Sequence, residues 1–159
     1  MRLPAEWEQQ EFVQLVFPHE NTDWREYLDE AIDTFVSIAK AIQKYQKVLI
    51  ISKNLEQIRK RFPKKNNLTF ITLDSDDTWS RDFGGITIEH EGKYLIEDFT
   101  FNAWGKKFAY EKDNQITRKL KLRGIFKGYS HKAIPLVLEG GAIESNGANI
   151  IMTTHYLAY

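Results

Sequence analysis

The chain of 159 residues contains no cysteine. It therefore cannot form a disulfide framework, a thiolate zinc site or an iron–sulfur site. It also cannot supply the thiolate on which many covalent enzymes depend. Cysteine-based catalysis would need a thiol from outside these residues.

Long apolar runs are also missing, since none approaches the ~20 residues that a membrane-spanning helix needs. The N-terminal segment Met1–Glu6 lacks the apolar core of a secretory signal peptide. With 42% hydrophobic and 13% aromatic residues, the composition is that of a globular protein of about one domain. We expect a cytoplasmic protein that does not act on membranes.

An excess of charge of one sign is the third absence, because Lys and Arg total 22, as do Asp and Glu. The neutrality hides blocks: residues 1–35 and 70–100 are acidic, whereas residues 40–65 and 105–132 are basic. In residues 40–65 the basic side chains are interleaved with helix and strand patterns. We interpret them as solvated faces and expect no binding to nucleic acid. The acidic block around Asp74–Asp82 favours a cationic ligand.

The first half of the chain predicts alternating strands and helices, which is typical of an α/β fold. Asp23 stands three residues before Glu26, as in a capping box, and Asn54 with Gln57 is a second helix-start signal. Apolar residues recur with helical spacing behind each signal. The predicted elements are a strand at 12–17, a helix at 24–42, a strand at 48–51, a short helix at 55–62 and a strand at 68–73.

The second half predicts hairpins around one helix. Glu91-Gly92 and Asn146-Gly147 are turn signals, and Pro135 indicates an edge strand. The chain stops in apolar residues 156–159 without a cap or charged tail, so we expect a fragment of a longer domain. The predicted elements are a hairpin of 86–88 with 94–96, a helix near 112–125 followed by a loop, a strand at 134–138, and a hairpin of 142–145 with 149–153.

The densest group of reactive side chains lies between Asp74 and Gly85, directly after a predicted strand. Asp82 and Trp79 suit a planar cation, because a carboxylate accepts forked N–H donors and an aromatic face adds cation–π attraction. The alternative is a solvated acidic turn with a packing Trp and a structural ion pair of Arg81. A calcium loop is disfavoured, since the glycine and distal Glu of an EF-hand are missing.

Two further positions are candidates. Glu139 ends a predicted strand between Leu138 and Gly140, so we expect a desolvated carboxylate that needs a partner. It is either a structural carboxylate or one that orients a catalytic group. Trp104 is either a pocket wall or a core residue. The four histidines have no metal-ligand spacing, and His19 is interpreted as a loop or interface residue.

Four motifs occur in order along the chain. They are Leu3-Pro4-Ala5-Glu6-Trp7-Glu8 with Phe17-Pro18-His19 and Asp23-Trp24; Asp77-Thr78-Trp79-Ser80-Arg81-Asp82-Phe83-Gly84; Asp98-Phe99 with Phe101-Asn102-Ala103-Trp104-Gly105; and Leu138-Glu139-Gly140-Gly141-Ala142-Ile143 with Gly147 and Thr153-Thr154. This ordered set, which spans residues 3–154, resembles the agmatine deiminases, with the bacterial peptidylarginine deiminases close by.

The resemblance implies a pentein α/β-propeller, in which ββαβ modules repeat with pseudo-fivefold symmetry around a central funnel. Residues 1–159 would form the N-terminal part of a single catalytic domain, about half of the propeller, without its C-terminal part. An open half-propeller exposes sheet edges and apolar surface. We therefore expect the missing part, or a second copy of the chain, to cover it.

The resemblance also implies a hydrolase that uses no cofactor and no metal. In the family a Cys thiolate attacks the guanidinium carbon and expels ammonia, water hydrolyses the amidino-thioether, and a His acts as general acid and base. By position, Asp82 would bind the guanidinium, Trp79 would lie beside it, and Glu139 would contact the catalytic His or the substrate. Trp104 is a further candidate substrate-binding residue. The family's Cys and His-x-Asp motif do not occur in this sequence.

Agmatine, converted to N-carbamoylputrescine and ammonia on the way to putrescine, fits this sequence better than peptidylarginine. The stretch 101–107 has aromatic residues but no Arg to grip a substrate carboxylate, although Lys106 or Lys107 could serve. The remaining alternative is a non-catalytic guanidinium-binding or interaction module. Because it lacks the nucleophile, the chain alone is expected not to release ammonia.

Overall fold

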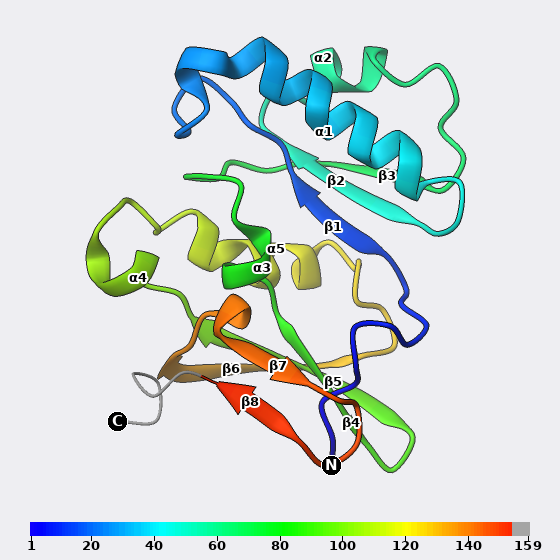
Figure 1. Cartoon of the computed structure of the whole chain (residues 1–159), viewed down its shortest axis with the longest axis vertical. Coiled ribbons are helices and arrows are strands. Elements are labelled where there is room, and N and C mark those ends of the chain that lie inside the picture. Colours follow the sequence, from blue (N-terminus) through cyan, green and yellow to red (C-terminus); the bar gives the residue numbers. More distant parts are fainter. Residues whose placement is uncertain (154–159) are drawn as a thin grey trace. The chain divides into compact units, whose positions relative to one another are not determined.

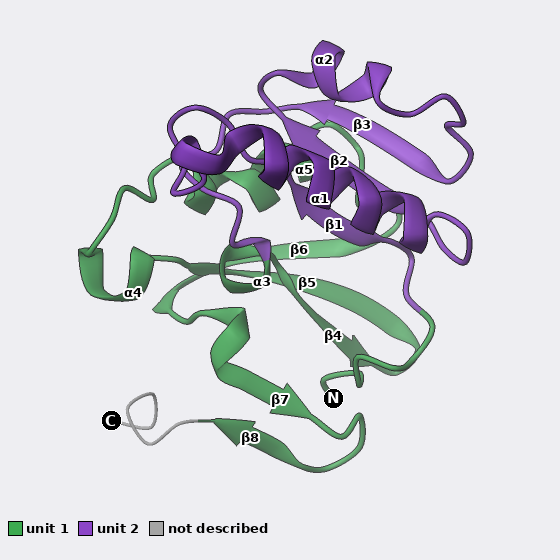
Figure 2. Cartoon of the chain, turned by 45° about the horizontal axis from the view of Figure 1, so that its top comes forward, with its two compact units in different colours: residues 1–9, 81–159 green, residues 10–80 purple. Residues whose placement is uncertain are grey.

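The computed structural model describes residues 1–153, so the apolar residues 156–159 lie outside the described part of the chain. The chain divides into two compact units, which Figure 2 shows in different colours. One unit consists of residues 10–80. The other combines residues 1–9 with residues 81–159.

The unit of residues 10–80 contains a parallel sheet with the order β1–β2–β3. Right-handed crossovers between strands added in one direction place the connecting helices on the same face, and Figure 1 shows α1 and α2 on one side of this sheet. The elements are β1 (Val13–Val16), α1 (Leu28–Ile42), β2 (Val48–Ser52), α2 (Leu55–Lys60) and β3 (Leu68–Thr72). The predicted order of strands and helices is confirmed.

The core of this unit lies between the sheet and the two helices. Val48 and Ile50 alternate along β2 and point to the same face, as the period of a strand requires. Val36 and Ala39 of α1 meet them, together with Ile58 of α2. All five side chains are at most 3% exposed, so this face of β2 is fully covered.

The first helix begins later than the sequence predicts. A 3-10 turn, η1 (Arg25–Tyr27), comes first and α1 starts at Leu28. In a capping box the Glu26 side chain would accept the Asp23 N–H. Here that N–H donates instead to Asp77 Oδ2 over 3.2 Å, so the predicted capping box is wrong.

The other unit contains a ββαβ arrangement. The hairpin β4 (Ile86–His90) and β5 (Lys93–Thr100) is followed by α5 (Ile116–Leu122) and by β6 (Ser130–Val137), which runs parallel to β5. Glu91-Gly92 forms the hairpin turn with φ of 52° and 73°, as a type I′ turn requires. This is the module that the family resemblance implies.

The boundaries after β5 differ from the sequence prediction. The helix predicted at 112–125 is confirmed but shorter, and β6 begins at Ser130, where a loop was predicted. Pairing with β5 extends the strand, and Leu95 faces Ser130. Within the described residues β6 lies at the edge of its sheet, as Pro135 predicted. The remaining elements are α3 (Ser80–Phe83), α4 (Ala103–Lys106), η2 (Asp113–Gln115), η3 (Gly140–Ala142), and the predicted hairpin β7 (Ile143–Ser145) with β8 (Ile151–Thr153).

A buried pair between β5 and β6 was not predicted. His131 Nε2 lies 3.1 Å from Asp98 Oδ2, and the two side chains are 13% and 7% exposed. Burial raises the pKa of Asp98, while the hydrogen bond from His131 and the charge of Arg118 oppose the rise. Only the register of β5 against β6 brings these side chains together, and the sequence does not reveal that register.

None of the helices within residues 1–153 is both long and apolar enough to span a bilayer.

Replacing His131 with Ala is expected to destabilise the fold by about 1–3 kcal/mol at pH 7, because the Asp98 carboxylate loses its buried hydrogen-bond partner. The pKa of Asp98 is raised, so its protonated form favours the folded state; that stability is present below the ordinary pKa of Asp and lost as pH rises. The penalty of the variant should therefore shrink toward pH 4. Urea unfolding followed by tryptophan fluorescence measures it.

The matched control is His90→Ala, since His90 is exposed at the end of β4. Equal unfolding free energies of the two variants at pH 7 would contradict a stabilising role of the buried pair.

Candidate functional site

Three segments meet at one end of the sheet β4–β5–β6. β5 and β6 are parallel, and the N–H of Leu138 donates to the carbonyl of Thr100 over 3.2 Å where the two strands end. β4 is antiparallel to β5, so its start lies at the same end. The segment before β4 carries Asp82, the one after β5 carries Trp104, and the one after β6 carries Glu139. The topology thus brings three of the four predicted site residues to one sheet end.

A close backbone approach places Glu139 beside Asp82. The N–H of Gly141 donates to Asp82 Oδ1 over 3.0 Å. A β-carbon at Gly141 would overlap the Asp82 carboxylate, and one at Gly140 would overlap the carbonyl of Arg81. The two glycines after Glu139 are therefore needed for this approach.

The environment of Glu139 disfavours its negative charge. Burial is the main cause that raises its pKa, and the nearby charge of Asp82 raises it further. Within residues 1–153 no hydrogen bond to the protein lowers this pKa. A cation with N–H donors would offset both effects, because it neutralises the repulsion and donates to the carboxylate.

Arg81 has a structural role. Its guanidinium lies 2.6 Å from Glu6 Oε1 and 3.5 Å from Glu144 Oε1, and it donates to the carbonyl of Ile143 over 3.2 Å. The ion pair considered as an alternative from the sequence therefore exists, but its carboxylates come from outside the acidic loop. It fastens the N-terminal motif to β7 next to Asp82.

Arg2 and residues of the N-terminal motif anchor the hairpin of β7 and β8. Arg2 lies 2.6 Å from Glu8 Oε1 and donates to the carbonyl of Gly147 over 2.7 Å. Hydrogen bonds from Arg2 and from the N–H of Ala5 lower the pKa of Glu8 to about 2. Ser145 Oγ donates to the carbonyl of Leu3 over 2.7 Å. The N-terminal segment therefore fixes β7 and the turn after it, which lie next in the chain to the Gly140-Gly141 segment.

Trp79 belongs to the unit of residues 10–80. Its ring centroid lies 6.4 Å from that of Trp24, whose Nε1–H donates to Thr78 Oγ1 over 2.9 Å. Trp79 is 43% exposed. The Trp79 ring is accessible to solvent and packs against Trp24, so it is suited to contact a ligand. The sequence places Trp24 at the start of the predicted helix and in the first family motif, but does not reveal its contact with Trp79.

The acidic loop is partly structural. Asp77 accepts N–H bonds from Thr78 over 2.7 Å and from Asp23 over 3.2 Å, and burial raises its pKa. His19, buried in the same unit, lies 3.1 Å from the carbonyl of Ser75 through Nε2. No group of three potential metal-ligating residues gathers within the described residues 1–153.

Trp104 lies in a segment with an unusual backbone. Ala103, Trp104, Gly105 and Lys106 have φ of 48°, 54°, 86° and 64°, all in the left-handed region. That region costs a residue other than Gly about 1–2 kcal/mol. Such strain persists only where the surroundings hold it, and it concentrates at functional sites.

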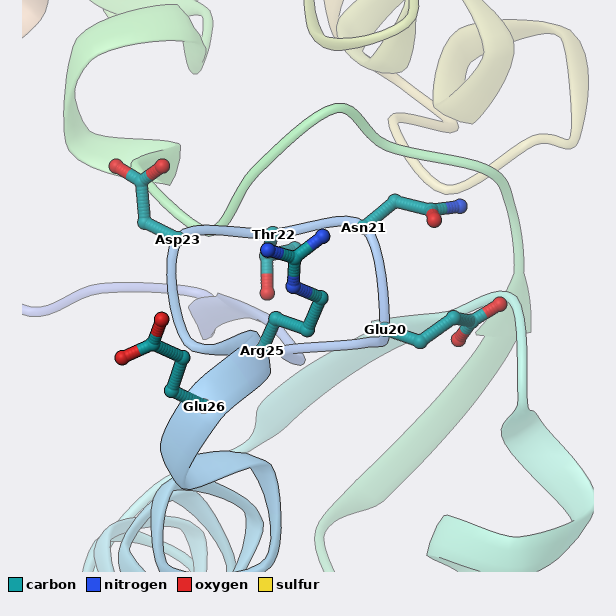
Figure 3. Close-up of a pocket in the computed structure, with 6 residues that line it drawn as sticks. All are labelled: Glu20, Asn21, Thr22, Asp23, Arg25 and Glu26. Carbon is teal, nitrogen blue, oxygen red and sulfur yellow. The ribbon is translucent and has the colours of Figure 1, made fainter.

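A shallow hollow after β1 contains none of the predicted site residues. It is lined by Glu20, Asn21, Thr22, Asp23, Arg25 and Glu26 (Figure 3). Hydrogen bonds, chiefly from Lys53, lower the pKa of Glu20 to about 2. Asn54, predicted to cap α2, donates to Glu20 over 3.2 Å instead. These side chains connect the loop to the end of β2.

Replacing Glu139 with Gln is expected to stabilise the fold at pH 8 but not at pH 4. Since the folded-state pKa is raised, ionising Glu139 destabilises the folded state as pH rises above the ordinary pKa of Glu. The neutral amide avoids this loss. Chemical unfolding at both pH values measures it, with Glu56→Gln on the exposed face of α2 as the control. If Glu139→Gln were less stable than the wild type, and by the same amount at pH 8 and at pH 4, the desolvated environment of Glu139 would be contradicted.

Comparisons with known proteins bear on this site. The family described as Porphyromonas-type peptidyl-arginine deiminase matches residues 2–158. Agmatine deiminase of Pseudomonas aeruginosa (strain LESB58) is 32% identical over 96% of the chain and 43% of its own length.

Two solved structures are similar throughout the chain. A cysteine-to-serine variant of C. jejuni agmatine deiminase with substrate bound gives a TM-score of 0.87 at 39% identity, over 96% of this chain and 45% of that one. Agmatine deiminase of Enterococcus faecalis gives 0.85 at 26% identity, over 98% and 44%. The fold is therefore the pentein α/β-propeller, and the chain spans less than half the length of these relatives. The chain belongs to the Porphyromonas-type peptidyl-arginine deiminase family.

Proposed function

We propose that this chain is the guanidinium-binding part of an agmatine deiminase. The observation that carries the proposal is the approach of Gly141 to Asp82, which holds the carboxylates of Asp82 and Glu139 at one sheet end. The relatives named agmatine deiminase support it. The small cationic substrate would be agmatine, and the reaction would take place in the cytoplasm on the way to putrescine.

The two carboxylates match the donors of a guanidinium. A planar guanidinium presents forked N–H groups that carboxylates accept in pairs. Glu139 is held in a state that disfavours its charge, so a bound cation would lower its pKa and release the proton it carries at acid pH. Trp104, which lies in the same unit as Asp82 and Glu139, would contact the substrate through its ring face.

The chain would bind the substrate but not attack it. In the complete reaction a thiolate would form a C–S bond to the guanidinium carbon, and the C–N bond to one amino group would break as that group takes a proton from a general acid and leaves as ammonia. Water would then form a C–O bond and the C–S bond would break; one proton of the water returns to the general acid and the other goes to solvent, so that the neutral ureido product N-carbamoylputrescine leaves and the thiolate is restored. This sequence supplies no Cys. Asp82 and Glu139 would orient the guanidinium for a nucleophile from elsewhere.

We further propose that residues 1–159 are the N-terminal part of one catalytic domain. The relatives are more than twice as long as the part they share with this chain. Leu136, Ile151 and Met152, on β6 and β8, are 62%, 61% and 64% exposed. Exposed apolar strands of this kind are suited to burial against further protein. The partner would be the C-terminal part or a second copy of the chain.

Peptidylarginine is the second candidate substrate. The family description favours it, and Lys106 and Lys107 follow Trp104 directly. A lysine there could pair with the carboxylate of a C-terminal arginine, which agmatine lacks. Nucleic acid and membranes are not proposed as partners.

The chain is expected to bind agmatine, and Asp82→Asn and Glu139→Gln are each expected to weaken binding at least about tenfold, because a charge-assisted hydrogen bond to the guanidinium is lost. Affinity should fall as pH drops below the raised pKa of Glu139, since the neutral acid no longer attracts the cation by charge and loses acceptor capacity for its N–H groups. Isothermal titration calorimetry between pH 5 and 8 measures both. Tighter binding of a C-terminal arginine peptide than of agmatine would favour the second candidate.

Ammonia release from agmatine is expected to be at background for this chain alone and to appear when a polypeptide with the family's Cys and His segment is added. A coupled ammonia assay measures it. Turnover by the isolated chain that Asp82→Asn abolishes would overturn the assignment of the nucleophile to another segment.

A further inference from the structure

Residues 103–106 form one turn of left-handed helix. The N–H of Lys106 donates to the carbonyl of Asn102 over 2.6 Å, and that of Lys107 to the carbonyl of Ala103 over 3.1 Å. These are the i to i+4 bonds of an α-turn, made with positive φ throughout. The side chain of Asn102 adds a third bond, since its Oδ1 accepts the N–H of Gly105 over 2.9 Å.

This turn aims Trp104 between two phenylalanines. The Trp104 ring meets Phe101 edge to face, with centroids 5.4 Å apart, and Phe108 likewise at 5.9 Å. Phe101 is 2% exposed and its centroid lies 5.9 Å from that of Phe83, the residue after Asp82. A row of rings therefore connects the Asp82 segment to Trp104.

The residues where the turn begins are also held by contacts outside the turn. The N–H of Phe101 donates to Oδ1 of Asn114 over 2.9 Å, and Asn114 lies in η2, just before α5. Ala103 is 1% exposed, so the turn is packed where it begins. Two features thus hold the strained backbone of the turn in place. One is the buried start of the turn at Ala103, and the other is the Asn102 side chain, which binds the N–H of Gly105 next to Trp104.

We propose that Asn102 is a positioning residue that locks this left-handed turn and so presents Trp104 to a substrate held by Asp82 and Glu139. This rests on the proposed function for the substrate, whereas the lock itself does not depend on any ligand. Without the Asn102 side chain the turn can relax toward right-handed backbone, and the ring loses its orientation. Binding suffers while the fold does not, because the lost bond is offset by relieved strain.

Lys106 tests the handedness of the turn in solution. Its side chain is exposed and its φ is 64°, so Lys106→Gly is expected to raise the unfolding midpoint. Lys107 is also exposed but has φ of −77°, and Lys107→Gly is expected to lower it. Gly105→Ala should destabilise through its φ of 86°, as Gly92→Ala should in the remote β4–β5 turn at 73°. A lower midpoint for Lys106→Gly than for Lys107→Gly would overturn the left-handed turn.

Asn102 is tested by two variants and two readouts. Asn102→Ala is expected to shift and broaden the Trp104 indole N–H resonance, assigned by its loss in Trp104→Phe, while the unfolding midpoint changes little. Asn102→Asp keeps an oxygen that accepts the Gly105 N–H, and is expected to restore the wild-type resonance. Agmatine affinity should fall about tenfold in Asn102→Ala and recover in Asn102→Asp, as expected for a lost cation–π contact.

The readouts separate two kinds of failure. If the wild-type chain gives no heat with agmatine, the proposed function fails for this chain, and the indole resonance still decides whether Asn102 orients Trp104. If wild type binds and Asn102→Ala binds equally well with an unchanged indole resonance, the positioning role is overturned. The positioning role is also overturned if Asn102→Ala lowers the affinity and the unfolding midpoint together and Asn102→Asp restores neither.

Discussion

The site depends on one close backbone contact, the approach of Gly141 to the carboxylate of Asp82. The hydrogen bond of 3.0 Å is ordinary in length, but it forms only because neither Gly140 nor Gly141 carries a β-carbon. It joins the segment before β4 to the segment after β6, so it sets the distance between two carboxylates 57 residues apart in the sequence. An alanine at either glycine would push these segments apart.

The electrostatics follow from that contact. Two carboxylates at one sheet end repel, and burial adds to the cost for Glu139, whose pKa is raised. Arg81 is the cationic residue next to Asp82 in the sequence, but its guanidinium pairs with Glu6 and donates to the carbonyl of Ile143. The fold thus holds negative charge that it does not fully compensate, an arrangement typical of a site for a cationic ligand. Neither carboxylate can attack a guanidinium, so in the proposed reaction binding and nucleophilic attack would reside in different segments.

The sequence predicts much of this fold because the signals are local. The Glu91-Gly92 and Asn146-Gly147 turns, the apolar strands and the edge position of Pro135 all follow from short-range rules. The capping box at Asp23 and Glu26 failed because Asp77, 54 residues away, takes the Asp23 N–H. The pair of His131 and Asp98 depends on strand register, which no local pattern reveals. Likewise, the left-handed turn around Trp104 was invisible, since three of its four residues are not Gly. The candidate residues Asp82, Trp79, Trp104 and Glu139 were found from their chemistry and their positions at predicted strand ends, and the family resemblance assigned their roles, which are predictions.

The most direct measurement is a double-mutant cycle on agmatine binding with Asp82→Asn and Glu139→Gln, read by calorimetry at pH 7. Two carboxylates that grip one guanidinium should be strongly coupled, so the double variant should lose little more affinity than either single variant. Strictly additive losses, or single variants that bind as well as wild type, would contradict a shared guanidinium site.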